Sequence, residues 1–547
     1  MKIFKKFITK EVLIISVIFL FALIIRIYNL GILPGSLHQD EIMNGYVGRF
    51  ILLNGKDLYG NSWPLLYFDR FGDFPNVLPM YLSGLSTFFF GINEFAIRFP
   101  IAFFGALGIL PVYLIAKLIF PLNSNAKFFP SIIFSLLPWH IILSRSTAEG
   151  ITGLTVFSFS LWFVLVGILN KQIRKIFLSS IFFLLTYFLY PSFRVLVPVS
   201  LLGLLFIPTN FQLKKILIVL TVFFFALTLF VSTTKWGQGR YLQTSLLQNI
   251  EIQNLIKGSN EAFSFDDGQN NIIVARIFHN KFAGLGREFL NQYFAYFSPN
   301  YLFLNGGLPP RYIVPGQGLI YITSVLIILL AALSIETNQT SNISKYMYYL
   351  LAIAPIPAAL TIDDTPNVHR SVLMILPLVF IISFALNKIY KMKLFTVPII
   401  YIVLLVFVIE FTYFFHQYNS HSSSYKSVLR NDGNKQTIQL LVSNQNKYKN
   451  IYIPVNNTMS LYYLFYTNNF SSNLEKKFSG DFVIDKVDNV IFLQNWCPSQ
   501  SLEYVQIPPE SLVINYGDCP PDSRFKEINS VYRKDSTKAY SFLIKND

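Results

Sequence analysis

The chain has 547 residues, of which 53% are hydrophobic, 17% aromatic and only 13% charged, whereas a typical soluble domain has about 25% charged residues. Its 55 phenylalanines and long apolar runs exclude a water-soluble enzyme, as well as a collagen, a coiled coil and a disordered chain. The net charge is +15, but the basic residues are spread over short loops rather than gathered in one patch, so we expect no nucleic-acid binding. The composition predicts a polytopic membrane protein.

Apolar runs near the roughly 20 residues needed to cross a bilayer recur along the chain. The opening segment Met1–Lys10 is basic, and the run behind it has no small-residue cleavage site, so we expect an uncleaved first span. We predict about eleven transmembrane helices, at 11–30, 98–120, 128–144, 151–169, 176–190, 194–208, 214–233, 316–333, 345–361, 371–387 and 394–415.

One further apolar run, 77–90, decides the orientation. It contains Pro79 and Gly84 and would cover about 21 Å of the roughly 30 Å hydrocarbon layer. If it lies in the interface, the positive-inside rule is satisfied, because the lysine-bearing loops then face the cytoplasm, at 121–127, 170–175, 209–215, 334–345 and 388–393. We therefore predict a multi-pass protein of the cell membrane with a cytoplasmic N-terminus and an extracytoplasmic C-terminus.

The tail changes composition after Asn419 and becomes rich in Asn, Ser, Lys and Asp. Short strand-like runs alternate there with turn signals, at 451–455, 482–484, 490–493 and 512–515. We predict a spanning domain over 1–415, with outer loops 31–97 and 234–315, and a small extracytoplasmic α/β domain over 416–547. Cys497 and Cys519 either form a disulfide worth roughly 3 kcal/mol or remain two free thiols, and we expect the disulfide.

Ionisable residues occur at the outer ends of the predicted spans. In the first outer loop, Asp40 and Glu41 follow His38 about ten residues beyond a span, where a carboxylate can act as a general base or bind a cation. The alternative is that Asp40 caps a helix over 41–53.

Three other outer connections carry the remaining candidates, which are Arg145, Glu149, Arg194, Asp363, Asp364, His369 and Arg370. A single arginine at the end of a span can simply reach for lipid phosphate. Together these residues suggest a site for an anionic, lipid-borne substrate, with arginines holding a phosphate and Asp40 doing acid–base work. No metal-ligand spacing is present; a divalent cation between Asp40 and Glu149 stays open, and we expect none to be obligatory.

Several motifs occur in a family-like order: His38-Gln39-Asp40-Glu41, Tyr59-Gly60-Asn61, Phe71-Gly72-Asp73, Gly91 to Pro100, Pro138-Trp139-His140, Tyr296 to Gly307 and His369-Arg370-Ser371. In these stretches the chain resembles bacterial glycosyltransferase family 39, which is similar to the protein O-mannosyltransferases and the lipid A aminoarabinose transferases. The resemblance covers about residues 10–415. It implies an all-α membrane domain of the GT-C architecture.

The resemblance also implies an inverting transfer of a sugar from a polyprenyl-phosphate donor to a protein, lipid or glycan acceptor at the outer face. Asp40 corresponds to the catalytic aspartate of the family, with Glu41 as its neighbour. A leaving phosphate gains from nearby cations, and our candidates for binding it are Arg70, Arg145, Arg194, His369 and Arg370. Candidates for lining the donor or acceptor pocket are His38, Glu149, Tyr296 and Asn305.

The chain departs from the family pattern in two places. Many members carry Lys-Pro-Pro after Phe-Gly-Asp, whereas the run 74–79 has no lysine, so Arg70 is our stand-in for the phosphate ligand. The position before the acidic pair is often aromatic, whereas here it is Gln39. The absence of a Trp-Trp-Asp motif argues against transfer of a whole glycan to asparagine.

Two alternatives remain open. The loop 234–315 is either an amphipathic segment resting in the membrane interface or a lid over the lipid-linked donor, and the resemblance favours the lid. A transporter or flippase of a lipid-linked glycan would also have many spans and cationic outer ends. We favour the transferase, because the spans lack mid-membrane polar residues and the outer loops are lopsided.

Overall fold

The computed structural model describes residues 10–70, 73–268, 271–333, 342–390, 392–394, 397–455, 458–503 and 507–546. The contacts divide the chain into two compact units made of interleaved segments. The first unit comprises Met1–Arg26, Phe103–Ser144 and Ala148–Phe415, and the second comprises Ile27–Ala102, Arg145–Thr147 and His416–Asp547. The second unit therefore joins the first outer loop to the tail, whereas we had predicted that loop as part of the spanning domain. Phe71, Gly72 and most of the predicted loop 334–345 lie outside the described residues.

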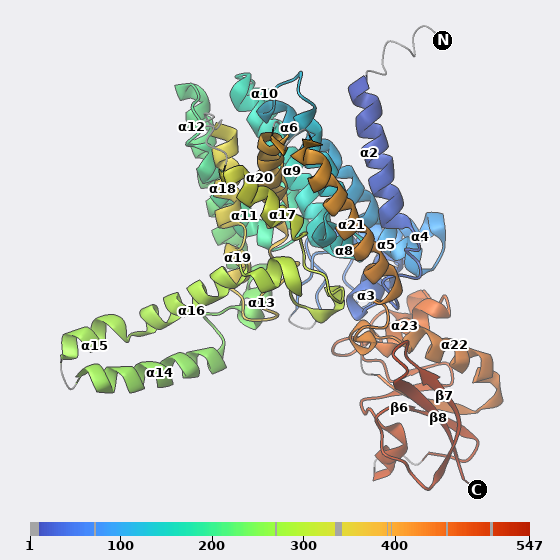
Figure 1. Ribbon diagram of the computed structural model, residues 1–547. Coiled ribbons are helices and arrows are strands. Elements are labelled where there is room, and N and C mark those ends of the chain that lie inside the picture. The colour runs from blue at the N-terminus through green and yellow to red at the C-terminus, as the bar shows by residue number, and fades with distance from the viewer. Residues whose placement is uncertain are drawn as a thin grey trace. The chain divides into compact units, whose positions relative to one another are not determined.

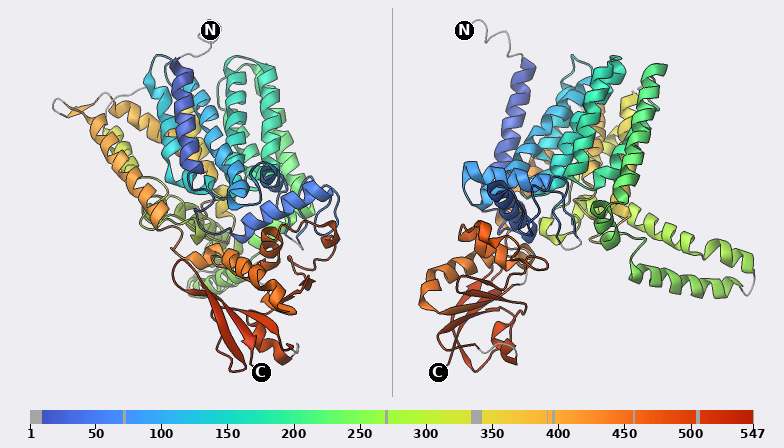
Figure 2. Two further views of the ribbon diagram at one scale, coloured as in Figure 1. Left: turned by 90° about the vertical axis from the view of Figure 1, so that its right-hand side faces the viewer. Right: turned by 180° about the vertical axis from the view of Figure 1, so that it is seen from behind.

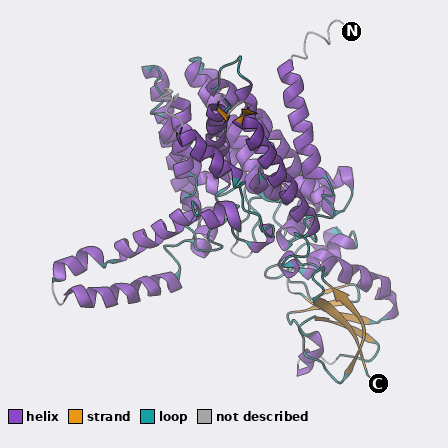
Figure 3. Ribbon diagram, in the orientation of Figure 1, coloured by secondary structure: helices purple, strands orange, loops and turns teal. Residues whose placement is uncertain are grey.

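The first unit is built of helices (Figures 1 and 3). They are α2 (Lys10–Ile27), α6 (Ile109–Ile119), α7 (Phe129–Leu136), α8 (Pro138–Ser144), α9 (Glu149–Leu169), α10 (Ile173–Leu189), α11 (Ser192–Leu204), α12 (Phe211–Ser232), α13 (Lys235–Thr244), α14 (Ile250–Gly268), α15 (Ile272–Phe278), α16 (Lys281–Ala295), α17 (Thr323–Leu333), α18 (Asn342–Ile353), α19 (Ile356–Ala359), α20 (Ile375–Ile389) and α21 (Ile399–Ser420). The helix α5 (Glu94–Leu107) begins in the second unit and continues into the first, and α21 begins in the first unit and ends in the second.

Among the described residues, five helical segments are long and apolar enough to cross a membrane: Glu94–Ile119, Glu149–Leu169, Phe211–Ser232, Val372–Ile389 and Ile399–Ser420. The bent pair Asn125–Leu136 and Pro138–Ser144 would make a sixth. The chain is thus a membrane protein. The other predicted spans coincide with the shorter or more charged helices α2, α10, α11, α17 and α18, so the number eleven stays a prediction.

The predicted span 128–144 is not straight. Its two halves, α7 and α8, meet at an angle of 52°. The break falls at Leu137, whose backbone is extended (φ −64°, ψ 122°), and the ring of Pro138 disfavours a helical conformation in the residue before it. A proline that opens α8 therefore ends α7.

The predicted outer loop 234–315 is largely helical. After α13, the helix α14 turns back through α15 and α16, and α14 packs against both of them. We call Ile250–Ala295 the arm; Figures 1 and 2 show its two helical runs side by side. Gly284 of α16 permits the close approach, since a Cβ there would lie 2.3 Å from Ile256 Cγ2 of α14. A short π-helix, Asn300–Leu304, follows α16.

The tail forms a six-stranded mixed sheet (Figure 3). Its strands are β3 (Asn450–Pro454), β4 (Lys486–Val487), β5 (Val490–Leu493), β6 (Ser511–Tyr516), β7 (Phe525–Tyr532) and β8 (Lys538–Lys545), in the order β4-β5-β3-β6-β8-β7. Strand β3 pairs in parallel with β5 and β6, and the other pairs are antiparallel. Helices α22 (Asn434–Asn444) and α23 (Met459–Tyr466) complete a small α/β domain. The predicted strand 482–484 is wrong, because Phe482 has a positive φ of 58° within a turn.

The second unit has one apolar core that joins its distant segments. Helices α3 (Gln39–Asn54) and α4 (Leu78–Phe90) supply Tyr46, Phe50 and Met80 to it. The tail supplies the side chains of α22, α23 and the sheet, including Ile438 and Phe465. Because these residues are fully buried together, the first outer loop and the tail fold as one body.

Two glycines set the distance between α3 and α4. A Cβ on Gly48 would lie 1.9 Å from the carbonyl oxygen of Met80, and one on Gly84 would lie 2.3 Å from the carbonyl carbon of Gly48. Small residues at a helix crossing allow such a backbone approach.

We expect Gly48→Ala to lower the free energy of unfolding by about 1–3 kcal/mol, measured by denaturant unfolding of the purified protein. Gly286→Ala is the control, because no atom lies within 4 Å of its added methyl group, and an equal loss in both variants would contradict this prediction.

The predicted disulfide is present between Cys497 and Cys519, which are 22 residues apart. In the chain-entropy model, closing such a loop stabilises the folded state by about 3 kcal/mol. We expect the double variant Cys497→Ser, Cys519→Ser to lose about that much free energy of unfolding. The loss is measured as a lower midpoint in denaturant unfolding. Wild-type protein treated with a reductant should then match the variant. Identical midpoints for oxidised wild type and variant would show that the loop needs no covalent closure.

Candidate active site

The helix α3 begins with a complete capping box. His38 is its N-cap and accepts a hydrogen bond at Nδ1 from the Asp40 amide (3.2 Å), and Glu41 Oε2 accepts one from the His38 amide (3.0 Å). The two reciprocal bonds satisfy amides that the first helical turn leaves open. The alternative in which Asp40 caps the helix is therefore wrong, and its carboxylate is not used for capping.

Glu41 is buried against a residue that our sequence reasoning did not select. Its two oxygens accept hydrogen bonds from Nε (2.9 Å) and Nη2 (2.8 Å) of Arg98, at the start of α5. Burial by itself raises the pKa of Glu41, but the Arg98 guanidinium outweighs it and holds the pKa of this carboxyl below its ordinary value. Glu41 is thus a fixed carboxylate beneath the start of α3, and it is closed to solvent.

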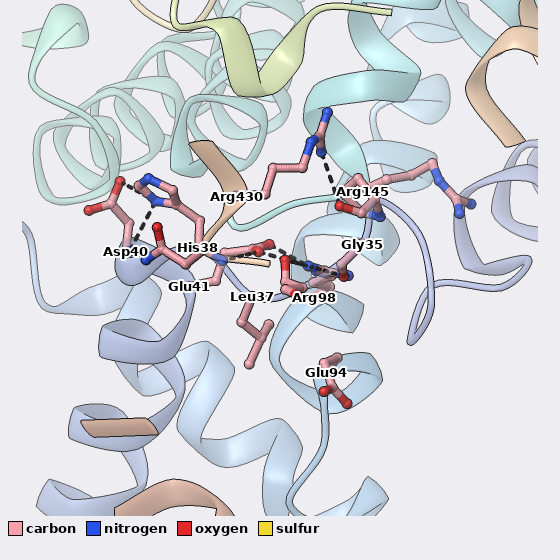
Figure 4. Close-up of polar contacts among 12 residues, drawn as sticks. Gly35, Leu37, His38, Asp40, Glu41, Glu94, Arg98, Arg145 and Arg430 are labelled. Carbon is pink, nitrogen blue, oxygen red and sulfur yellow. Dashed lines mark hydrogen bonds and ion pairs between the residues drawn. The ribbon is translucent and has the colours of Figure 1, made fainter. Parts of the chain in front are cut away.

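The same guanidinium also organises the segment before α3. Arg98 donates to the carbonyls of Leu30, Gly35 and Ser36 at 3.0–3.4 Å, and Figure 4 shows it beside Glu41 and Gly35. A charged group inside an apolar helix is costly unless it is fully hydrogen-bonded, as it is here. Arg98 therefore fixes both the segment before α3 and the carboxylate within its first turn.

Two further buried arginines of the second unit bind the same segment. Arg145 donates to the Tyr28 carbonyl (2.7 Å) and lies 5.0 Å from the ring centroid of Tyr418, and Arg430 donates to the Pro34 carbonyl (3.1 Å). Arg145 is only 2% exposed. Its contacts hold the chain between α2 and α3, a role the sequence did not suggest for it.

Asp40 itself is half-buried, with 39% of its side chain exposed. Its Oδ2 lies 3.2 Å from His38 Nδ1, the contact drawn in Figure 4. Asp40 is therefore a partly accessible carboxylate on a rigid support, which is the condition for a general base.

Arg70 is a cation of the first outer loop that interacts electrostatically with Asp40. It makes a bidentate ion pair with Asp481 of the tail, with both N···O distances 2.5 Å, and its guanidinium lies 5.4 Å from the ring centroid of Phe482. Burial lowers the pKa of Arg70, but Asp481 raises it above its ordinary value, and Asp40 and Asp73 add to the rise. Of the predicted phosphate ligands, Arg70 and Arg145 belong to the same unit as Asp40, and Arg70 Nη1 lies 3.7 Å from Met43 Sδ, one turn further along α3.

The first unit gathers a separate set of predicted residues. His369 Nε2 accepts a hydrogen bond from the Gly150 amide (2.9 Å) and lies 3.7 Å from the carboxylate of Glu149, the first residue of α9. Its ring stacks on Tyr190 with a centroid distance of 4.3 Å. Three connections that are distant in sequence thus meet at His369, as the sequence analysis proposed for their outer ends.

Arg370 and Arg194 have partners within the first unit. Arg370 pairs with Asp363 (2.8 Å) and donates to Thr361 Oγ1 (2.8 Å). Burial and the neighbouring Asp363 raise the pKa of Asp364. Arg194 lies flat on Trp236, 3.8 Å from the ring centroid, and is 7% exposed. Arg370 is thus part of a charged turn, whereas Arg194 is part of the core.

Two of the four residues predicted to line a pocket, Tyr296 and Asn305, differ in accessibility. Tyr296 is fully buried and its hydroxyl accepts a hydrogen bond from the Asn367 amide (3.0 Å). Burial raises its pKa to about 12. Asn305 is exposed and donates to Asn300 Oδ1 (2.6 Å) at the end of the π-helix. Asn305 is therefore accessible from solvent, whereas Tyr296 is not.

Within the described ranges, no three His, Cys, Asp or Glu side chains are grouped so that they could hold a metal ion. The two carboxylates considered for a divalent cation, Asp40 and Glu149, belong to different units. Each carboxylate has nearby partners within its own unit instead, His38 for Asp40 and His369 for Glu149.

Arg98, Arg430 and Asp481 were not selected from the sequence. The signal for Arg98 was available, since an arginine inside an apolar run of a predicted span requires an acidic partner. Arg430 and Asp481 lie in the polar tail, where charged residues are common and no spacing marks them.

Solved structures that the chain matches include ArnT from Cupriavidus metallidurans in the apo state, at 12% sequence identity and a TM-score of 0.42, covering 97% of this chain and 96% of that chain. ArnT from Cupriavidus metallidurans bound to undecaprenyl phosphate also matches, at 12% identity and a TM-score of 0.40, covering 97% of each chain. These values are too low to identify the family or the activity of this chain. No protein-family model matches the chain, and no curated protein matches it in sequence.

Proposed function

We propose that this chain is an integral-membrane inverting glycosyltransferase of the GT-C type. It transfers a sugar from a polyprenyl-phosphate donor to an acceptor at the outer face of the cell membrane, with a hexose or a pentose as the transferred group. Its partners are the lipid-linked donor, membrane lipids and an acceptor that is a protein, a lipid or a glycan. The observation that carries the proposal is the setting of Asp40, a partly exposed carboxylate in the first turn of α3, with Arg70 Nη1 3.7 Å from Met43 Sδ one turn further along the same helix.

The proposed chemistry is a single displacement. Asp40 takes the proton of the acceptor hydroxyl as its oxygen attacks the anomeric carbon of the sugar. The bond between that carbon and the phosphate oxygen breaks, and the polyprenyl phosphate leaves with the bonding electrons. A phosphate leaving group needs little protonation, but positive charge stabilises it.

Supporting residues have distinct roles in this proposal. Glu41 and Arg98 position Asp40, because their buried ion pair fixes the first turn of α3. His38 caps the same turn and contacts the Asp40 carboxylate. Arg70 is our first candidate for the donor phosphate, since it combines positive charge with proximity to Asp40. The His369 and Arg370 region of the first unit is a second candidate binding region for donor or acceptor.

The test is to reconstitute the purified protein with short-chain polyprenyl-phosphate sugars and candidate acceptors. We expect formation of a glycosylated acceptor and release of polyprenyl phosphate in equal amounts, measured by mass spectrometry. A transporter or flippase would instead move the intact lipid-linked glycan between leaflets without cleaving it. Flipping without sugar release would replace the transferase by that alternative.

A further inference from the structure

The arm, Ile250–Ala295, exposes more large apolar side chains than a segment in water would tolerate. Four phenylalanines and five aliphatic residues are each more than half exposed: Phe265, Phe278, Phe282, Phe294, Ile250, Leu255, Ile272, Ile273 and Ile277. Contiguous exposed apolar surface of this kind marks a binding or membrane-contact site. The exposed apolar residues occur on all three helices of the arm, so the whole arm has surface that is favoured in an apolar environment.

Four apolar residues of α16 form a stripe along one side of the helix. They recur at intervals of three and four residues: Phe282, Leu285, Phe289 and Tyr293. Phe282 is 85% exposed, whereas the other three side chains are half-buried. The buried side is formed by Gly284 and Gln292, and Gly284 lies against Ile256 of α14. The apolar stripe is therefore not the surface that α16 uses to pack on α14.

The base of the arm is attached at the ends of apolar helices. Before the arm, Leu246 donates a backbone hydrogen bond to Leu360 (2.9 Å), and near its end the Tyr293 hydroxyl donates to the carbonyl of Ala352 in α18 (2.8 Å). The chain reaches the arm from α12, a candidate span that ends at Ser232, through α13, which packs against it. The arm thus leaves the first unit close to the level at which a membrane-spanning helix ends.

The charges on the arm show how it meets the membrane. The segment contains five acidic and four basic residues. Charged residues at the bilayer centre are strongly disfavoured, so α14, with its five charged residues, does not cross the membrane. The near balance of charges also means that anionic headgroups are not the main attraction.

We propose that the arm lies in the membrane–water interface, with the α16 stripe and with Phe278 and the isoleucines of α15 inserted among the lipid acyl chains. The occupant of this apolar surface is the lipid bilayer. Aromatic residues are favoured at that depth, and the mixed charges stay at the headgroup level. The proposal concerns the arm alone and holds whatever reaction the chain performs.

The experiment uses the full chain in phosphatidylcholine nanodiscs with one introduced cysteine carrying a bimane label. Phe282→Cys places the label on the stripe, and Asn291→Cys is the matched control, since it is exposed and nine residues further along the same helix, roughly on the opposite side. Both native cysteines are in the disulfide and do not react with the label. Phe278→Cys on α15 provides a second test position.

We expect spin-labelled phosphatidylcholine to quench the label at 282 and 278 and to quench it at 291 by at most about a third as much. Iodide in the aqueous phase should show the reverse order. Equal iodide quenching at all three positions would overturn the proposal and place the arm in water. Protection from iodide without quenching by lipid would also overturn it, because a protein, such as a second copy of the chain, would then cover the stripe.

Discussion

Replacing Asp40 by asparagine is expected to abolish sugar transfer, with the turnover rate falling by about 10²–10⁴-fold. The amide of asparagine has the size of the carboxylate but cannot accept the proton of the acceptor hydroxyl. The start of α3 should stay intact, because its capping box uses His38 and Glu41 and not the Asp40 side chain. The measurement is the initial rate of acceptor glycosylation with a polyprenyl-phosphate sugar, at saturating donor.

The matched control for this prediction is Asp69→Asn. Asp69 lies in the same outer loop, is partly exposed and lies outside the helix start that carries Asp40. It should keep close to wild-type turnover. Both variants should bind donor and unfold as wild type does, so that a loss confined to Asp40→Asn reports on chemistry. Wild-type turnover in Asp40→Asn would remove Asp40 from the mechanism.

Replacing Arg98 by methionine is expected to lower the free energy of unfolding by about 3–5 kcal/mol. The substitution leaves the Glu41 carboxylate buried with its main partner gone and releases the carbonyls of Leu30, Gly35 and Ser36. Denaturant unfolding of the purified protein in detergent would measure the loss. Turnover should fall together with stability, because the first turn of α3 carries Asp40.

The double variant Glu41→Gln, Arg98→Met separates the ion pair from the rest of the contacts. Removing both charges should recover part of the loss, since the buried unpaired charge is then gone.

The dependence of stability on acid pH provides a second measurement of the same ion pair. The folded pKa of Glu41 lies below its ordinary value of 4.5, so its contribution to stability is present above that value and is lost as the pH falls through the folded pKa. Glu41→Gln should remove this part of the pH dependence, and an unchanged acid profile would contradict the assignment.

Much of the fold could be predicted from local patterns. Long apolar runs predicted the helices, because a helix in a membrane must be both apolar and continuous. Strands β3, β5 and β6 were predicted because each is a short apolar run between turns. The disulfide followed from two cysteines in one polar domain. In each of these cases the local sequence contains most of the determining interactions.

What could not be predicted depends on distant partners. Strand β7 has four consecutive exposed residues and reads as a loop until β8 pairs with it. The sequence placed Arg145 and Arg70 together as phosphate ligands, but their partners, a backbone carbonyl at Tyr28 and the carboxylate of Asp481, lie more than 100 residues away. The sequence singled out Asp40 and Glu41 as a pair, yet the separate environments of the two carboxylates depend on Arg98.

The shared core of the second unit also constrains how the protein is made. The face of α3 that bears Tyr46 and Phe50 is completed by side chains from α22, α23 and the sheet, which begin more than 300 residues later in the chain. At about 5–20 residues per second, a ribosome needs on the order of 15–60 s to reach them. Throughout that interval the candidate catalytic loop has been synthesised without its packing partners. The apolar face of α3 in the newborn chain is thus open to chaperones and proteases until the tail has been synthesised.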